Sequence, residues 1–79
     1  MVENDRKPVK AIERGVYRLR NGLKAEVQKY EERYAFPYSG VVYRRNEVFD
    51  FNWKEEGYAI SENYPSEFDL VELIEVKPL

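Results

Sequence analysis

The sequence predicts an all-β protein, a small SH3-like barrel of five strands with one short helical turn before the last strand. Two observations carry this prediction. Apolar and polar residues alternate over 15–19 and 23–28, and the pattern of paired strands returns over 40–44 and 48–53. Aromatic residues make up 15% of the 79 residues, so even this short chain can bury a core. Closing a bent sheet would also remove most exposed strand edges.

The first hairpin turns at an Asn-Gly pair. A two-residue turn would place Leu19 opposite Lys24 and mix the two faces. A three-residue loop over 20–22 pairs Leu19 with Leu23 and Tyr17 with Ala25, and keeps the apolar residues on one face. We therefore expect the three-residue loop, with Gly22 in the left-handed conformation.

A second hairpin follows at 40–44 and 48–53. Pairing Tyr43 with Phe49 implies a three-residue loop over 45–47, and Trp53 continues the Phe49 face into the core. Residues 58–60 are a candidate for a further short strand beside these, and Ser66, three residues before Asp69, marks the helical turn. The last strand spans 70–76.

Residues 1–14 show no alternation and are expected to form a flexible or weakly ordered segment ahead of a single domain over 15–79. The alternative to a barrel is an open sheet of four or five strands completed by a second subunit.

The net charge of −2 hides an uneven distribution. Residues 1–45 carry a net charge of +5, and residues 46–79 carry −7. Such a split can indicate a nucleic-acid arm, an acidic tail or self-complementary faces that favour a homo-oligomer. Its plainest explanation is that basic and acidic strands are neighbours in the sheet.

Enzymatic chemistry finds little support. The chain has no His and no Cys, so the commonest general base and the usual zinc ligands are missing. The carboxylates stand at no diagnostic spacing, and Glu31, Glu32, Glu55 and Glu56 are expected to be solvated loop charges. We expect a non-enzymatic protein without cofactor or metal, and no membrane span. The absence of Cys is typical of a cytoplasmic protein.

Basic residues of the first hairpin form a candidate ligand site. The predicted register places Arg18 opposite Lys24, with Arg20 at the turn. Like charges across a strand pair are destabilising, so Glu26, an acidic loop or a bound anion must offset them. The functional interpretation is a phosphate-binding patch. The alternative interpretation is a solvated face without a ligand.

Aromatic residues accompany these cations. Four of them fall in the connection before Gly40: Tyr30, Tyr34, Phe36 and Tyr38. Tyr34 and Tyr38 could stack on a base while nearby cations hold its phosphates, or the loop could simply complete the core. Tyr43, Arg44 and Arg45 form a second basic and aromatic spot.

Four blocks of sequence follow one another in a distinctive order: residues 17–25, then Pro37 and Gly40, then Trp53 and Gly57, then residues 66–71. This order resembles a group of small, largely uncharacterised accessory proteins encoded by bacteriophages and prophages. The tyrosine-rich connection at 28–38 is longer than in that group. The resemblance implies a protein that acts on a bacterial host from within its cytoplasm, as an anti-defence protein.

Two functions follow as expectations. The first is a module that sequesters a nucleotide-like anionic signal in a groove or between subunits of a homo-oligomer. The alternative is a protein–protein inhibitor that presents a sheet edge or an aromatic patch to a host protein. Nucleic acid is an unexpected partner, because the pI is near 5.2.

Overall fold

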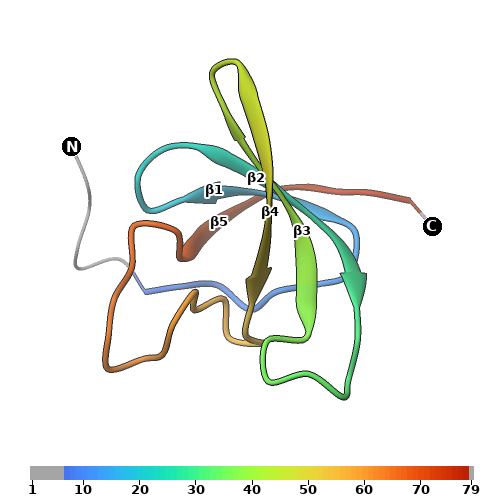
Figure 1. Ribbon diagram of the computed structural model, residues 1–79, viewed down its shortest axis with the longest axis vertical. Coiled ribbons are helices and arrows are strands. Elements are labelled where there is room, and N and C mark those ends of the chain that lie inside the picture. The colour runs from blue at the N-terminus through green and yellow to red at the C-terminus, as the bar shows by residue number, and fades with distance from the viewer. Residues whose placement is uncertain (1–6, 79) are drawn as a thin grey trace.

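Five antiparallel strands form one twisted sheet in the computed structural model, which describes residues 7–78 (Figure 1). The strands are β1 (Gly15–Leu19), β2 (Lys24–Tyr30), β3 (Tyr38–Arg44), β4 (Glu47–Trp53) and β5 (Leu70–Val76). Their order in the sheet is β4-β3-β2-β1-β5, so the last strand returns to lie beside the first. The predicted all-β class and strand number are confirmed. The sheet does not close into a barrel, because β4 and β5 form its two margins and do not pair with each other.

The first hairpin has the predicted register. Tyr17 is paired with Ala25 and Arg18 with Lys24. The Leu19 N–H donates to the Leu23 carbonyl oxygen at 2.8 Å, which closes a three-residue loop. Gly22 within that loop has a φ of 90°, a conformation that side-chain-bearing residues rarely adopt.

The second hairpin differs from the prediction by one residue. Phe49 pairs with Val42, and Tyr43 pairs with Val48, so the turn contains only Arg45 and Asn46. Arg45 takes the positive φ of 44° that this tighter turn requires. The observed register places Val42 on the core face and leaves Tyr43 on the outer face, because a tyrosine tolerates water better than a valine does.

The core lies on the inner face of the sheet, where alternate residues of the strands meet. Trp53 is completely buried, as predicted, and its indole N–H donates to the Phe68 carbonyl oxygen at 2.9 Å. The Phe68 ring packs against Phe51 at a centroid distance of 5.1 Å. The buried apolar residues are Ala11, Tyr17, Leu19, Ala25, Val27, Val42, Trp53, Ala59, Leu70 and Val71.

The connection from β4 to β5 contains neither the expected strand nor a helix. Residues 58–60 form a bend, and the nearest β-type contact is an isolated bridge between Ser61 and Tyr64. The predicted helical turn is a single hydrogen-bonded turn: the Asp69 N–H donates to the Ser66 carbonyl oxygen at 3.1 Å. Ser66 also donates its N–H to the Asp69 carboxylate at 3.0 Å, and its hydroxyl accepts the Phe68 N–H at 3.1 Å, which resembles a capping box. No further helical turn forms, because β5 begins at Leu70.

Residues 7–14, the described part of the segment expected to be weakly ordered, contact β5 and the β4–β5 connection; residues 1–6 lie outside the described residues. The Val9 N–H donates to Leu70 and the Ala11 N–H donates to Glu55, both at 2.8 Å. Ala11 is buried in the core. Gly57 permits this close approach, since a Cβ there would lie 2.2 Å from the Val9 carbonyl oxygen.

The uneven charge distribution of the chain is explained by which strands are neighbours. Arg18 on β1 forms an ion pair with Glu72 on β5. Arg20 pairs with Asp69, and Arg44 stands opposite Glu47 across the second hairpin. The basic first half and the acidic second half of the chain therefore meet within one sheet.

Candidate binding site

The predicted cations Arg18 and Lys24 do lie side by side on the outer face of the sheet. One row across that face runs from Glu72 through Arg18, Lys24 and Tyr43 to Val48. Lys24 is exposed and makes no ion pair with another residue in the range 7–78. This end of the sheet thus presents two adjacent cations and one tyrosine.

The chain itself offsets the repulsion between these two cations. The Arg18 Nε lies 3.7 Å from a Glu72 carboxylate oxygen, and an Arg18 terminal nitrogen donates to the Gly22 carbonyl oxygen at 3.0 Å. On the neighbouring row, Glu26 accepts a hydrogen bond of 3.0 Å from the Tyr43 hydroxyl. An anion is therefore not required to stabilise this pair of cations, and the structural need for a negative ligand disappears.

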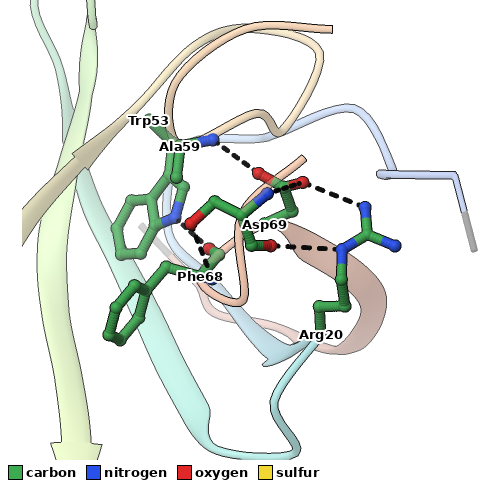
Figure 2. A network of polar contacts seen from close by, with 6 residues as sticks. Arg20, Trp53, Ala59, Phe68 and Asp69 are labelled. Atoms are coloured by element: carbon green, nitrogen blue, oxygen red, sulfur yellow. Dashed lines mark hydrogen bonds and ion pairs between the residues drawn. The ribbon is translucent and has the colours of Figure 1, made fainter. Parts of the chain in front are cut away.

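Arg20 does not belong to the exposed basic patch, and the expectation that it does is wrong. Its side chain is 3% exposed and its guanidinium lies 2.9 Å from Asp69 Oδ2 (Figure 2). Its Nε donates to the Ser66 carbonyl oxygen at 3.1 Å. The other Asp69 oxygen accepts the Ala59 N–H at 2.8 Å. Arg20 thus fixes the connection between β4 and β5, because a buried charge requires a partner of opposite sign.

The tyrosines of the connection before Gly40 lie far from the basic patch, whereas Tyr43 lies beside Lys24. Tyr30 is the last residue of β2 and Tyr38 is the first of β3. Both were expected in the loop between these strands, but they belong to the strands themselves. Lys24 begins β2, which places it about 20 Å from Tyr30 at about 3.3 Å per residue. Figure 1 shows the connection between β2 and β3 at the far end of the sheet from the turn between β3 and β4. A base stacked on Tyr34 could not place its phosphates on Lys24.

Arg44 and Arg45 occupy the tip of the second hairpin. Arg44 lies beside Leu23 and Phe68, on the opposite face from Tyr43. Arg45 occupies the turn itself. These two residues and Tyr43 are neighbours in sequence, but the alternation of the strand prevents them from forming one surface.

The tyrosine-rich connection borders a recess that the sequence prediction did not include. This recess is shallow, measures about 400 Å³ and lies between the β2–β3 connection and the start of the β4–β5 connection. Its lining residues are Tyr30, Glu32, Tyr34, Ala35, Pro37, Lys54, Glu55 and Glu56. Three carboxylates and one ammonium group give the lining a negative charge.

Each aromatic ring of the recess has a defined neighbour. The Tyr30 ring lies 4.8 Å from the Tyr38 ring, and its hydroxyl donates to Glu55 at 3.2 Å. The Arg33 guanidinium lies over the Tyr34 ring, 5.0 Å from its centroid. Tyr34 remains 53% exposed, so this ring presents aromatic surface to solvent next to the carboxylates.

The negative charge of the recess is reflected in the tyrosine pKa values. Partial desolvation raises the pKa of Tyr30, and the hydrogen bond to Glu55 and the charges of Glu55 and Glu32 raise it further. Burial raises the pKa of Tyr38, as do the charges of Glu55 and Glu13. Desolvation is the largest cause of both shifts; only the smaller contribution of the carboxylates reflects a negative potential, which would also attract a cation.

The carboxylates of this recess were expected to be solvated loop charges. Glu32, Glu55 and Glu56 are indeed at the surface, but the fold brings them together beside Tyr34. The sequence contains a signal for this arrangement: one Glu-Glu pair follows Tyr30, the other follows Lys54 just after Trp53, and β2 and β4 both end where β3 begins.

The described residues were also compared with the patterns of metal sites and membrane-spanning helices. Residues 7–78 contain no group of three or more His, Cys, Asp or Glu residues arranged to hold a metal ion. No helix in that range has the length and apolar character to cross a bilayer. No protein-family model, curated protein or solved structure matches this chain.

Proposed function

We propose that this protein is a non-enzymatic binding module that receives a lysine or arginine side chain of a partner protein in its acidic recess. The observation that supports this function is the meeting of three carboxylates with an exposed tyrosine: Glu32, Glu55 and Glu56 border the same recess as Tyr34. A cation in this position would gain both electrostatic attraction and contact with an aromatic face.

The chemistry of the recess favours a cation over the anion expected from the sequence. Only Lys54 contributes a positive charge to the lining, and its ammonium lies 5.5 Å from the Phe36 ring centroid. The contact between the Arg33 guanidinium and the Tyr34 ring supports the attraction of this ring for a cation. A phosphate would meet the repulsion of three carboxylates in the same position.

The shape of the recess favours a side chain of a larger partner over a free small molecule. Ligand sites usually bury most of the ligand surface in a cleft. This recess is shallow and open, so one inserted side chain would leave most of the affinity to the surrounding surface. A protein that docks on the loop of Tyr34 would supply that additional contact.

The proposed partner is a host protein. In the context of the phage and prophage resemblance, the module would inhibit a bacterial defence protein by covering a basic segment on its surface, within the host cytoplasm. This is the protein–protein alternative raised by the sequence, with the aromatic patch now combined with acidic residues.

The test is a titration of the ¹⁵N-labelled protein with the peptides acetyl-Gly-Lys-Gly-amide and acetyl-Gly-Arg-Gly-amide, with acetyl-Gly-Glu-Gly-amide as the charge control. The basic peptides are expected to shift the amide signals of Tyr34 and Glu56. Tyr34→Ala is expected to weaken binding about threefold, since an exposed cation–π contact contributes roughly 0.5–1 kcal/mol. Glu56→Lys is expected to weaken it more.

Two matched controls separate the recess from general surface charge. Tyr64 is exposed and lies outside the recess, so Tyr64→Ala is expected to bind as the parent does. Glu47 lies on β4 near the opposite end, so Glu47→Lys makes the same charge change elsewhere. If the basic peptides shift no signal at the recess, or if Glu47→Lys weakens binding as much as Glu56→Lys, the proposed function is wrong.

A second candidate function is the sequestration of a nucleotide-like anion at the opposite end of the sheet. The supporting observation is that Lys24, without an ion pair in the range 7–78, lies between Arg18 and Tyr43 on the outer face. Titration with a cyclic dinucleotide tests it in the same spectra. Shifts at Lys24 and Tyr43 that vanish in Lys24→Glu would support this function, and unchanged spectra would exclude it for that ligand.

A further inference from the structure

The C-terminal half of β5 is an apolar strand at an open margin of the sheet. Leu73, Ile74 and Val76 are 42%, 40% and 62% exposed. The outer edge of β5 is covered at its start, where Leu70 exchanges backbone hydrogen bonds with Gly57 and Val9. From Glu72 onward, no strand of the described residues pairs with this outer edge, and β1 occupies only the inner edge of β5. Such an edge is a template for pairing with another strand.

Backbone geometry singles out Val76 as the residue that is ready to pair. The Lys77 N–H points toward the β1 side of the strand, where it donates to the Arg14 carbonyl oxygen at 2.6 Å. Because the polar groups of successive strand residues alternate in direction, the N–H and C=O of Val76 point away from β1. Val76 therefore presents both a donor and an acceptor at the open edge.

The charges beside Val76 are complementary to those of an identical strand. Glu75 and Lys77 lie on the same face, with their charged groups 4.0 Å apart. When two copies of β5 are placed antiparallel with a two-fold axis at Val76, Glu75 of each copy stands opposite Lys77 of the other. An axis at Glu75 would instead oppose two glutamates, which is unfavourable. An axis at Leu73 would require the edge at Leu70, which is already occupied.

We infer that β5 pairs with β5 of a second copy of this chain, antiparallel about a two-fold axis at Val76, to form one continuous sheet. The two Val76 residues would exchange both backbone hydrogen bonds, and two pairs of Glu75 and Lys77 would flank them. The β-bulge between Tyr17 and Val16 bends β5 just before this segment, so the ladder would be short. An interface of this size is weak, so the dimer forms only at high protein concentration.

The test is sedimentation equilibrium of the whole chain from about 5 µM to about 500 µM, a range that includes weak complexes. The parent is expected to shift from monomer to dimer across this range. Glu75→Lys places like charges opposite each other twice, and it is expected to weaken the dimer roughly tenfold. Lys77→Glu is expected to do the same. The double variant Glu75→Lys/Lys77→Glu restores opposite charges and is expected to restore the dimer.

The control is Glu62→Lys, which makes the same charge change in an exposed turn of the β4–β5 connection. It is expected to dimerise as the parent does. Circular dichroism checks that each variant is folded, and Lys77→Glu replaces Glu75→Lys if the latter is not. A parent that stays monomeric throughout would overturn the inference. Single variants that weaken the dimer without rescue by the double variant would overturn it as well.

Discussion

Removing the Asp69 carboxylate should destabilise the fold more than removing any exposed carboxylate. Asp69 is completely buried, and its two oxygens accept hydrogen bonds from the backbone of Ala59 and Ser66 and from the Arg20 guanidinium. In Asp69→Ala, Arg20 loses the counter-charge beside which it is buried. Figure 2 shows the carboxylate at the centre of these contacts.

The size of this effect follows from the burial of the pair. Breaking a buried ion pair by removing one partner costs about 3–5 kcal/mol. A chain of 79 residues has a total stability of roughly 4–12 kcal/mol at the usual value per residue. Asp69→Ala is therefore expected to remove a large share of the free energy of unfolding. If the stability of the parent is near the lower end of that range, much of the variant will be unfolded.

Urea unfolding monitored by Trp53 fluorescence measures this loss. Trp53 is the single tryptophan and donates to Phe68, the residue before Asp69, so its emission reports on the same region. Asp50→Ala is the matched control, because Asp50 is an exposed aspartate on β4. A loss below about 1 kcal/mol in Asp69→Ala, similar to the usual cost of an exposed substitution, would refute the reasoning.

Two further predictions concern a close backbone approach and a buried phenol. Gly40→Ala is expected to cost at least about 1–3 kcal/mol in the same assay, because its Cβ would lie 1.9 Å from the Glu26 carbonyl oxygen. Gly22→Ala meets no neighbouring atom within 4 Å, so its expected cost of about 1–2 kcal/mol comes only from the strained φ of 90°. Burial raises the pKa of Tyr17 above its ordinary value, against a smaller lowering by the N–H of Ile12, so the folded state holds this proton more tightly. Its contribution to stability is complete below pH 10 and is lost as the pH rises above 10. Tyr17→Phe should therefore make the urea midpoint fall less steeply with pH above 10.

Local pattern was sufficient to predict the first hairpin but not the second. Around Gly22, strict alternation of apolar residues left one register that buried them together. Around Arg45, Tyr43 was assigned to the wrong face because its ring is apolar and its hydroxyl is polar. The two-residue turn also needs a positive φ at Arg45, which an arginine does not signal in a sequence.

Contacts between distant residues account for the rest of the differences. The pairing of Arg20 with Asp69 joins residues 49 positions apart, so a cation counted as part of a surface patch is in fact buried. The candidate ligand site was wrong for a similar reason: Lys24 begins β2, whereas Tyr34 lies in the connection after the other end of that strand. The recess around Glu55 could be recognised only once β2 and β4 were known to end at the same end of the sheet, on either side of β3.

The position of β1 has a consequence for how the chain folds as it is made. β1 is the second strand from one margin, and its neighbour on that side is β5, the last strand in the sequence. On the ribosome, the hairpin of β1 and β2 can form early, but Arg20 must wait for Asp69 to emerge before its charge is neutralised. The nascent polypeptide would therefore expose an unfinished apolar layer until Asp69 and Leu70 have emerged from the ribosome.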